Sequence, residues 1–422
     1  MKLLSYVLTI LLFIGPVILS VAGWPVAGFD EKSKNSYYFP SFYILTVLFV
    51  AFSLKHKLIG SNLKYAITIV VFCFFCFFLN LILGRGTNTN IYFHSMALPA
   101  MYYIFYELLG NDQVIRANIK KLILLLFTFN GLMAIYERLT LTLYYPYDLI
   151  RFEFDYELDE MMAFRSSALL GHPLTNALIM SIIMTFILIS DFNVIKKYSL
   201  CLIGFFSLFC FNARAAIMIS AGIFALYNIR PIIHKGESLS RRFFSAILLV
   251  SFIIIGAYLF SAGFAGRFEE RGNLSEDGSA LARIEVFGIL SQYGISNFLW
   301  GLPYKDVENM AIAVLGMTHI ENWFILSTML VGLVVTTVVT FLFIPVYRYA
   351  IKPYSRYSSF LIFISTIVLA STNNSLATGI PALSIFFACC YAFSPIDIVA
   401  EPEMNVANES IGTSEIQEKT NS

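Results

Sequence analysis

Long apolar runs alternate with short polar segments along most of this chain. A helix needs about 20 residues to cross the hydrocarbon core of a membrane, and most of the runs approach that length. They lie at residues 3–22, 38–54, 65–84, 93–109, 120–137, 172–190, 198–212, 215–229, 243–261, 322–346, 358–371 and 376–395. The pattern predicts an all-α, polytopic integral membrane protein with about twelve transmembrane helices.

The composition supports the same fold class. Hydrophobic residues make up 58% of the 422 residues and charged residues only 13%, whereas about 25% of the residues in soluble domains are charged. The formal net charge of +1 gives no sign of the strongly basic face that nucleic-acid binding requires. We therefore expect a membrane protein with no nucleic-acid partner.

Basic residues in the loops indicate the orientation, because loops rich in Lys and Arg generally stay in the cytoplasm. On this rule both termini are cytoplasmic, and so are the loops that carry Lys55, Lys57, Lys64, Arg116, Lys120, Lys121, Lys196, Lys197, Arg230, Lys235, Arg241, Arg242, Arg348, Lys352 and Arg356. The first run follows Lys2 and resembles a signal peptide, but its length favours a retained span. We expect a membrane domain over residues 1–398 and a disordered cytoplasmic tail over 399–422.

The six cysteines all fall inside predicted spans, so we expect no disulfides. Cys73 and Cys76 have the spacing of a redox or zinc motif, but the surrounding run is Val-Phe-Cys-Phe-Phe-Cys-Phe-Phe. In such a run a cysteine behaves as a small apolar residue, which makes packing the favoured interpretation.

Two outer loops are much longer than an ordinary connection of about 4 to 6 residues. They cover residues 139–171 and 262–320, and the second lies between the ninth and tenth spans. The first contains a close cluster of four carboxylates, which favours a solvated acidic loop over a metal site because nothing else there has metal-ligand spacing. These carboxylates are Asp155, Glu157, Asp159 and Glu160.

The second outer loop carries an amphipathic helical pattern of its own. Leu281, Ile284 and Phe287 have helical spacing, and Ser279 is a plausible N-cap. A short helix on the outer membrane surface would present Arg283 along its polar side. A helix that only closes the loop explains the pattern equally well.

The seventh and eighth spans form a short hairpin. It has about 34 residues from Lys197 to Arg230, where two crossings ordinarily use about 40. Its tip, which ends in Arg214, should therefore lie below the outer surface. An Arg at that depth is expected to face a water-filled cavity or a partner anion, and the alternative is an Arg that snorkels to the head groups.

Two spans begin with residues that suit anion binding. Gly171 and Pro173 stand at the start of the sixth span and Asn322 at the start of the tenth. Helix starts offer unpaired N–H groups and a partial positive charge, which suit phosphate. Arg165, Arg214 and Arg283 can converge there, because the planar guanidinium group pairs two phosphate oxygens at once.

Four short motifs resemble those of the O-antigen ligase and polymerase superfamily. Gly171-His172-Pro173 with Asn176 resembles its glycine-proline-asparagine motif, and Ala213-Arg214-Ala215 resembles its Ser-Arg-small turn. Arg283 with Phe287 resembles the Arg of its long periplasmic loop. Glu321-Asn322 followed by Gly332 resembles its closing His-Asn signature. The order of the motifs and the long outer loop also match, over about residues 120–346.

One departure favours the polymerase branch. Ligases of this superfamily carry His where this chain has Glu321, and His319 lies two residues too early to replace it directly. The resemblance therefore implies a polymerase of O-antigen or exopolysaccharide repeat units in the bacterial inner membrane. It would move the growing glycan from undecaprenyl diphosphate to the next lipid-linked repeat unit on the periplasmic side, without metal or cofactor.

The resemblance also implies roles for individual residues. Arg214 and Arg283 of these motifs would bind the diphosphate, joined by Arg165 from the argument on helix starts, and Glu321 or His319 would activate the acceptor hydroxyl. The motif residues that would position these groups are Gly171, His172, Pro173, Asn176 and Asn322. Expected partners are the lipid-linked donor and acceptor, membrane lipids, a chain-length regulator and a flippase.

Two other functions stay open. A ligase-like transferase would share this fold and differ mainly in its acceptor. A flippase of lipid-linked oligosaccharides can also have about twelve spans, but transporters usually show internal repeats and charges near the bilayer midplane. Here the ionisable residues gather at the predicted outer end, and the two halves show no convincing repeat.

Overall fold

The structure is a computed structural model. It describes residues 1–26, 37–54, 63–83, 91–144, 164–234, 236–259, 261, 286–289, 294–315, 320, 322–372, 376 and 381–395. Within these ranges the chain is helical, apart from turns and an isolated bridge between Val26 and Tyr37. The helices are α1 (Lys2–Leu11), α2 (Pro16–Val21), α3 (Pro40–Leu54), α4 (Lys64–Ile82), η1 (Ile91–Ala97), α5 (Leu98–Leu109), α6 (Gln113–Thr140), α9 (Pro173–Ile189), α10 (Val194–Cys210), α11 (Arg214–Ile233), α12 (Leu239–Leu259), α15 (Ile295–Trp300), α16 (Tyr304–Leu315), α17 (Trp323–Val331), α18 (Leu333–Ile351), α19 (Arg356–Phe363), η3 (Ile364–Val368) and α20 (Ala382–Phe393).

The described helices indicate a membrane-embedded protein. Five of them are long and apolar enough, by length and composition, to cross a membrane: α4, α6, α11, α12 and α18. Further apolar helices of 10–17 residues accompany them. The predicted fold class is confirmed at this level, whereas the number of about twelve spans stays a prediction.

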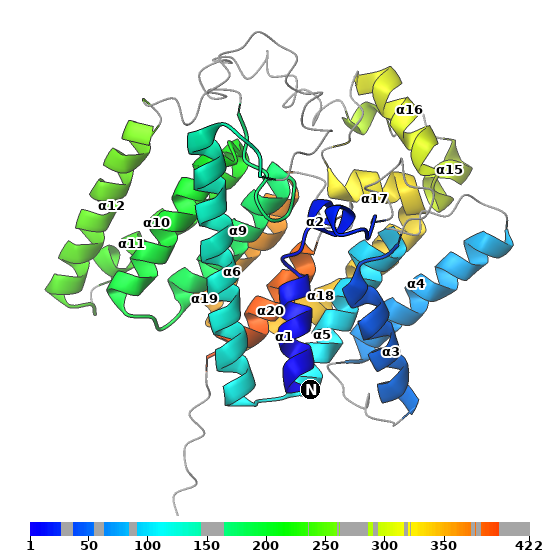
Figure 1. The fold of residues 1–422 in the computed structure, drawn as a ribbon, viewed down its shortest axis with the longest axis horizontal. Coiled ribbons are helices and arrows are strands. Elements are labelled where there is room, and N and C mark those ends of the chain that lie inside the picture. The colour runs from blue at the N-terminus through cyan, green and yellow to red at the C-terminus, as the bar shows by residue number, and fades with distance from the viewer. Residues whose placement is uncertain are drawn as a thin grey trace, which may run out of the picture.

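The helix α9 occupies the centre of the bundle. It is apolar on every side and buried along almost its whole length, as expected for a helix that other helices surround. It packs against α6, α10, α11, α19 and α20. In contrast, α12 packs mainly against α11, lies at one edge of the molecule (Figure 1) and leaves most of its apolar side chains exposed.

The helix α6 is the longest of the described helices, and its C-terminal half contacts the segment that leads into α9. The carboxylate of Asp112 caps its start by accepting the N–H groups of Val114 and Ile115 at 2.9 and 3.0 Å. A buried stripe then follows at helical spacing through Ile119, Ile123 and Phe127. In Figure 1 this helix runs from the lower side of the molecule at its N-terminal end to the upper side at its C-terminal end.

The predicted first span, 3–22, is not one continuous helix. The helix α1 ends at Leu11, and α2 begins at Pro16, a residue that tolerates the first helical position well. Between them Gly15 touches another segment so closely that an added Cβ would lie 2.6 Å from Leu170 Cα. The helix breaks where a distant piece of backbone needs room.

The predicted tenth span, 322–346, is broken in the same way. Gly332 separates α17 from α18 with a φ of 87°, which favours glycine. Across from it Gly301 has a φ of 83°, and an added Cβ there would lie 2.6 Å from the carbonyl oxygen of Leu330. The N–H of Leu302 donates to the carbonyl of Met329 at 2.8 Å, which links the chain just after Gly301 to the helix that ends before Gly332.

The predicted outer loop 262–320 contains more helix than the sequence indicated. It includes α15 and α16, and a helical turn over 286–289. In that turn Val286 and Ile289 are buried while Phe287 is 61% exposed. An exposed Phe287 is compatible with a helix on the membrane surface, and the predicted apolar face stays a prediction because Leu281 and Ile284 lie outside the described residues.

Several predictions fall on residues that the structure does not describe. They are the carboxylates Asp155, Glu157, Asp159 and Glu160, the candidate helix residues Ser279, Leu281 and Ile284, and the tail 399–422. The cysteines are described: all six are buried free thiols, and Cys73 and Cys76 lie within α4 as the packing interpretation predicts.

The break at Gly332 leads to a stability prediction. We expect Gly332→Ala to lower the melting temperature in detergent by the equivalent of about 1–3 kcal/mol, because Ala disfavours this φ and its Cβ would collide with the backbone of Leu299. Gly222→Ala in α11 is the matched control. Nothing lies within 4 Å of a Cβ at Gly222, so Ala should be neutral or stabilise the helix by up to about 1 kcal/mol. Equal melting temperatures would show that Gly332 is not constrained.

Candidate functional site

A non-helical segment, residues 164–171, leads into α9 and is mostly buried. We call it the buried segment. Gly15 N, at the start of α2, donates to the carbonyl of Leu169 at 3.3 Å, and further hydrogen bonds join the segment to α6 and α10. The C-terminal end of α6 and the helix α2 lie on the upper side of Figure 1, where α15, α16 and α17 also lie. The buried segment, which is bonded to α6 and to the start of α2, therefore lies toward this side of the bundle.

Arg165 joins the buried segment to the turn between α10 and α11. Its Nε donates to the carbonyl of Phe211 at 3.3 Å, and the N–H of Ser166 donates to the carbonyl of Cys210 at 3.0 Å. Arg165 is only 7% exposed, so the surrounding protein holds its side chain. Two segments that lie far apart in the sequence, the buried segment and the turn before Arg214, are in direct contact here.

Arg214 is the first residue of α11 and follows the same turn. The turn residues Phe211, Asn212 and Ala213 are all buried among the helices, whereas the depth of this turn below the outer membrane surface stays a prediction. Asn212 has a φ of 49°, which ends α10 and allows the chain to reverse. Arg214 itself is half-buried. Arg165 thus contacts the buried turn that Arg214 follows, while Arg283 lies outside the described residues.

The motif around the start of α9 has a structural explanation. Gly171 has a φ of 73°, and an added Cβ would lie 2.5 Å from Cγ2 of Val17. Pro173 opens the helix, and His172 before it is exposed. Asn176 Nδ2 donates to the carbonyl of Ser167 and, at 3.0 Å, to that of His172. These residues fasten the buried segment to the central helix.

Three polar residues near the end of α6 also hold the buried segment, and sequence reasoning did not select them. They are Asn130, Glu137 and Arg138, all buried. Glu137 accepts N–H groups of the segment, Asn130 accepts one more, and Arg138 donates to the carbonyl of Phe164. The sequence did contain a signal for two of them. Asn130 and Glu137 lie within the predicted apolar span 120–137, and polar residues in such spans tend to be functional.

Asn322 belongs to a different group of helices. Its side-chain oxygen accepts the N–H groups of Phe324 and Ile325, both at 3.1 Å, and so caps the start of α17. The helix α17 packs against α15, α16, α18 and η1. The described contacts thus explain Asn322 as a cap and do not join it to Arg165. Glu321 and His319 lie outside the described residues.

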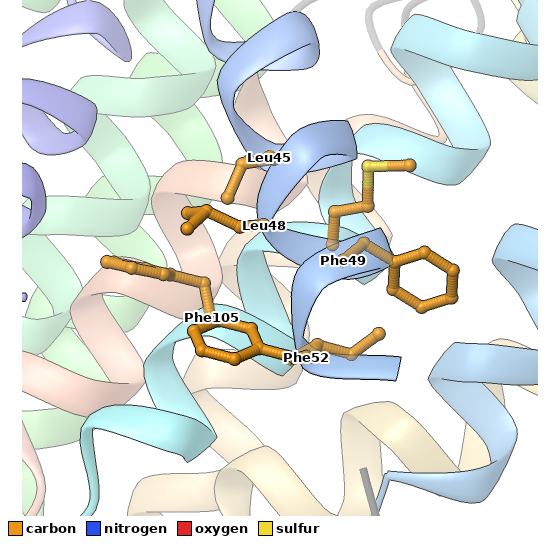
Figure 2. Close-up of a pocket in the computed structure, with 7 residues that line it drawn as sticks. Leu45, Leu48, Phe49, Phe52 and Phe105 are labelled. Atoms are coloured by element: carbon orange, nitrogen blue, oxygen red, sulfur yellow. The ribbon is translucent and has the colours of Figure 1, made fainter. Parts of the chain in front are cut away.

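A separate apolar pocket lies between α3 and α5 (Figure 2). Leu and Phe side chains of α3 face Met, Ile and Phe side chains of α5 across it, and no charged side chain lines it. It therefore offers nothing to bind a phosphate. Its lining residues are Leu45, Leu48, Phe49, Phe52, Met101, Ile104 and Phe105.

The charges at the buried turn suit an anion. One guanidinium group is buried and held by a carbonyl, and a second, half-buried one opens a helix. Within the described ranges, no group of three His, Cys, Asp or Glu residues is placed to hold a metal ion. No protein-family model and no curated protein matches this chain. Its function has to be argued from these residues.

Substitutions at two adjacent residues of α9, Asn176 and Thr175, test whether the side chain of Asn176 holds the buried segment. We expect Asn176→Leu to cost about 1–3 kcal/mol of stability, because the carbonyl of Ser167 loses its donor inside the protein. Thr175→Val is the matched control. Thr175 is equally buried, and its hydroxyl has no hydrogen-bond partner in the described part of the chain, so the apolar replacement should be neutral or stabilising. Thermal unfolding in detergent measures both, and a control that loses as much as Asn176→Leu would contradict this interpretation.

Proposed function

We propose that this chain is a repeat-unit polymerase for O-antigen or exopolysaccharide, a metal-independent glycosyltransferase of the bacterial inner membrane. It transfers glycan from undecaprenyl diphosphate to a lipid-linked repeat unit at the periplasmic face. The observation that carries the proposal is the contact between Arg165 and the turn that precedes Arg214. Arg165 lies against the turn after which Arg214, 49 positions later in the sequence, begins α11, and this closeness supports a shared diphosphate site.

The proposed reaction exchanges one bond at the anomeric carbon of the donor sugar. An acceptor hydroxyl forms the new glycosidic bond, the bond to the diphosphate breaks, and undecaprenyl diphosphate leaves with the electron pair. The hydroxyl proton passes to a general base. Glu321 is the leading candidate for this base, with His319 or His172 as alternatives. Fixed guanidinium groups stabilise the charge that develops on the leaving diphosphate.

The two described arginines suit different parts of this task. Arg165 is held in place by protein groups on several sides, so it can offer charge without reorganising during the reaction. Arg214 is half-buried and can reach a bound diphosphate from the start of α11. Arg283 is assigned to the same site by its motif alone. The donor and acceptor lipids approach within the membrane, and a chain-length regulator and a flippase are the proposed protein partners.

Deletion of the gene distinguishes the three candidate functions. Loss of a polymerase should leave a surface glycan of one repeat unit, because attachment to the final acceptor continues. Long polymer that accumulates on undecaprenyl diphosphate would favour a ligase-like transferase. Repeat units trapped on the cytoplasmic side would favour a flippase. Glycan length on gels and the analysis of lipid-linked intermediates separate these outcomes.

Arg214 gives the sharpest substitution. We expect Arg214→Ala to lower polymer formation roughly tenfold to more than a hundredfold, which corresponds to a loss of about 1.5–3 kcal/mol of charge-assisted contact in the transition state. Arg214→Lys should recover only part, because Lys keeps the charge but loses the two-pronged geometry.

Arg230→Ala is the matched control for Arg214→Ala. Arg230 stands at the other end of the same helix, where its guanidinium group stacks on Tyr357 at 4.4 Å. Polymer length should be normal in this variant at matched expression. Normal polymer from Arg214→Ala as well would remove the proposed site.

A further inference from the structure

The carboxylate of Glu137 is fully buried and binds backbone N–H groups from two separate places. Its Oε1 accepts the N–H of Tyr144 at 3.1 Å. Its Oε2 accepts the N–H groups of Ser167 and Ala168 at 2.8 and 2.9 Å. Tyr144 and Ser167 stand on opposite sides of residues 145–163 of the predicted first outer loop. One side chain therefore closes the base of that loop.

The contacts of Glu137 belong to a row along one face of α6. Asn130, Ala134, Glu137 and Arg138 have the spacing of a single helical face. Asn130 Oδ1 accepts the N–H of Leu169 at 3.0 Å. The carbonyl of Ala134 accepts the hydroxyl of Ser166 at 2.7 Å.

Arg138 completes the row. Its Nη1 donates to the carbonyl of Phe164 at 2.5 Å. The row as a whole therefore follows the buried segment from Leu169 back to Phe164.

This row determines where Arg165 lies. Phe164 before it and Ser166 after it are both bonded to α6, so the backbone of Arg165 has little freedom. Its side chain then reaches the carbonyl of Phe211.

The two successive N–H groups of Ser167 and Ala168 point at one carboxylate oxygen of Glu137. Without that oxygen, two buried donors would have no acceptor there. Ala168 also has a φ of 40°, which is unfavourable for an L-residue and has to be held by its surroundings.

We propose that Glu137 is a positioning residue for the diphosphate site, with Asn130 as its partner on the same helical face. Glu137 shapes the buried segment, and the segment holds Arg165 against the turn that precedes Arg214. The hold on the segment is independent of the proposed function. Its consequence for glycan transfer rests on that function.

Hydrogen–deuterium exchange on the full-length protein in nanodiscs tests the hold directly. We expect Glu137→Gln to raise by about tenfold the exchange rate either of the Ser167 and Ala168 amides or of the Tyr144 amide, because Gln has one acceptor oxygen and can serve only one of these two places. Glu137→Asp keeps the charge and should recover part of the protection. Unchanged exchange in Glu137→Gln would overturn the proposal.

Asn228→Ala is the control for a general loss of stability. Asn228 is an equally buried amide on α11 that accepts the hydroxyl of Tyr198 at 2.6 Å and donates to the carbonyl of Phe224 at 2.9 Å. Its loss should leave exchange in the buried segment as in the unsubstituted protein. Equal acceleration by Asn228→Ala and Glu137→Gln would show general loosening and overturn a positioning role.

A double-substitution cycle in cells tests the link to Arg165. Polymer formation is measured for Glu137→Gln, Arg165→Ala and the pair together at matched expression. If Glu137 acts through Arg165, the pair should be no worse than Arg165→Ala alone, whereas independent effects would multiply and overturn the link. If the segment loosens in Glu137→Gln but Arg165→Ala makes normal polymer, the hold on the segment stands and the proposed diphosphate site fails.

Discussion

Inside an apolar bundle a non-helical segment needs a hydrogen-bond partner for each backbone N–H group, because neither water nor a neighbouring turn of helix supplies one. The buried segment 164–171 meets this need through groups on other helices. Glu137 and Asn130 of α6 accept three of its N–H groups, and the carbonyl of Cys210 at the end of α10 accepts another. The need for these partners brings α6, the start of α9 and the α10–α11 turn to one place. Arg165 and Arg214 come to the same place with them.

Close approach of backbone to backbone is the second constraint at this end of the molecule. Gly15 makes room for the backbone of Leu170. Gly301 makes room for the backbone of Leu330, and Gly332 for that of Leu299. Each approach coincides with a break in an apolar run, between α1 and α2 or between α17 and α18. The upper side in Figure 1 therefore has short pieces such as α2, α15 and α17. Such pieces can surround a polar site, whereas uninterrupted helices present only side chains.

The apolar pattern predicted most of the helices because it is a local property. The run 65–84 became α4, and the run 172–190 became α9, with ends shifted by a few residues. The same pattern failed at Gly15 and Gly332, because an apolar run does not indicate where another segment will press against it. It also missed α15 and α16, whose mixed polar composition resembles that of a loop. Short motifs selected Arg165, Arg214 and Asn176, but not what holds them.

The sequence by itself determined an all-α protein rich in apolar helices, with buried cysteines and a short hairpin between α10 and α11. These features follow from composition and spacing within one segment, where the distances along the chain set the geometry. Only the tertiary structure decided that Glu137 closes the base of a loop and that Arg165 lies against the turn before Arg214. The contact of Glu137 with Ser167 joins residues 30 positions apart, and that of Arg165 with Phe211 joins residues 46 positions apart. Which donor meets which acceptor over such a separation depends on how the helices pack, and the pattern along the chain does not record it.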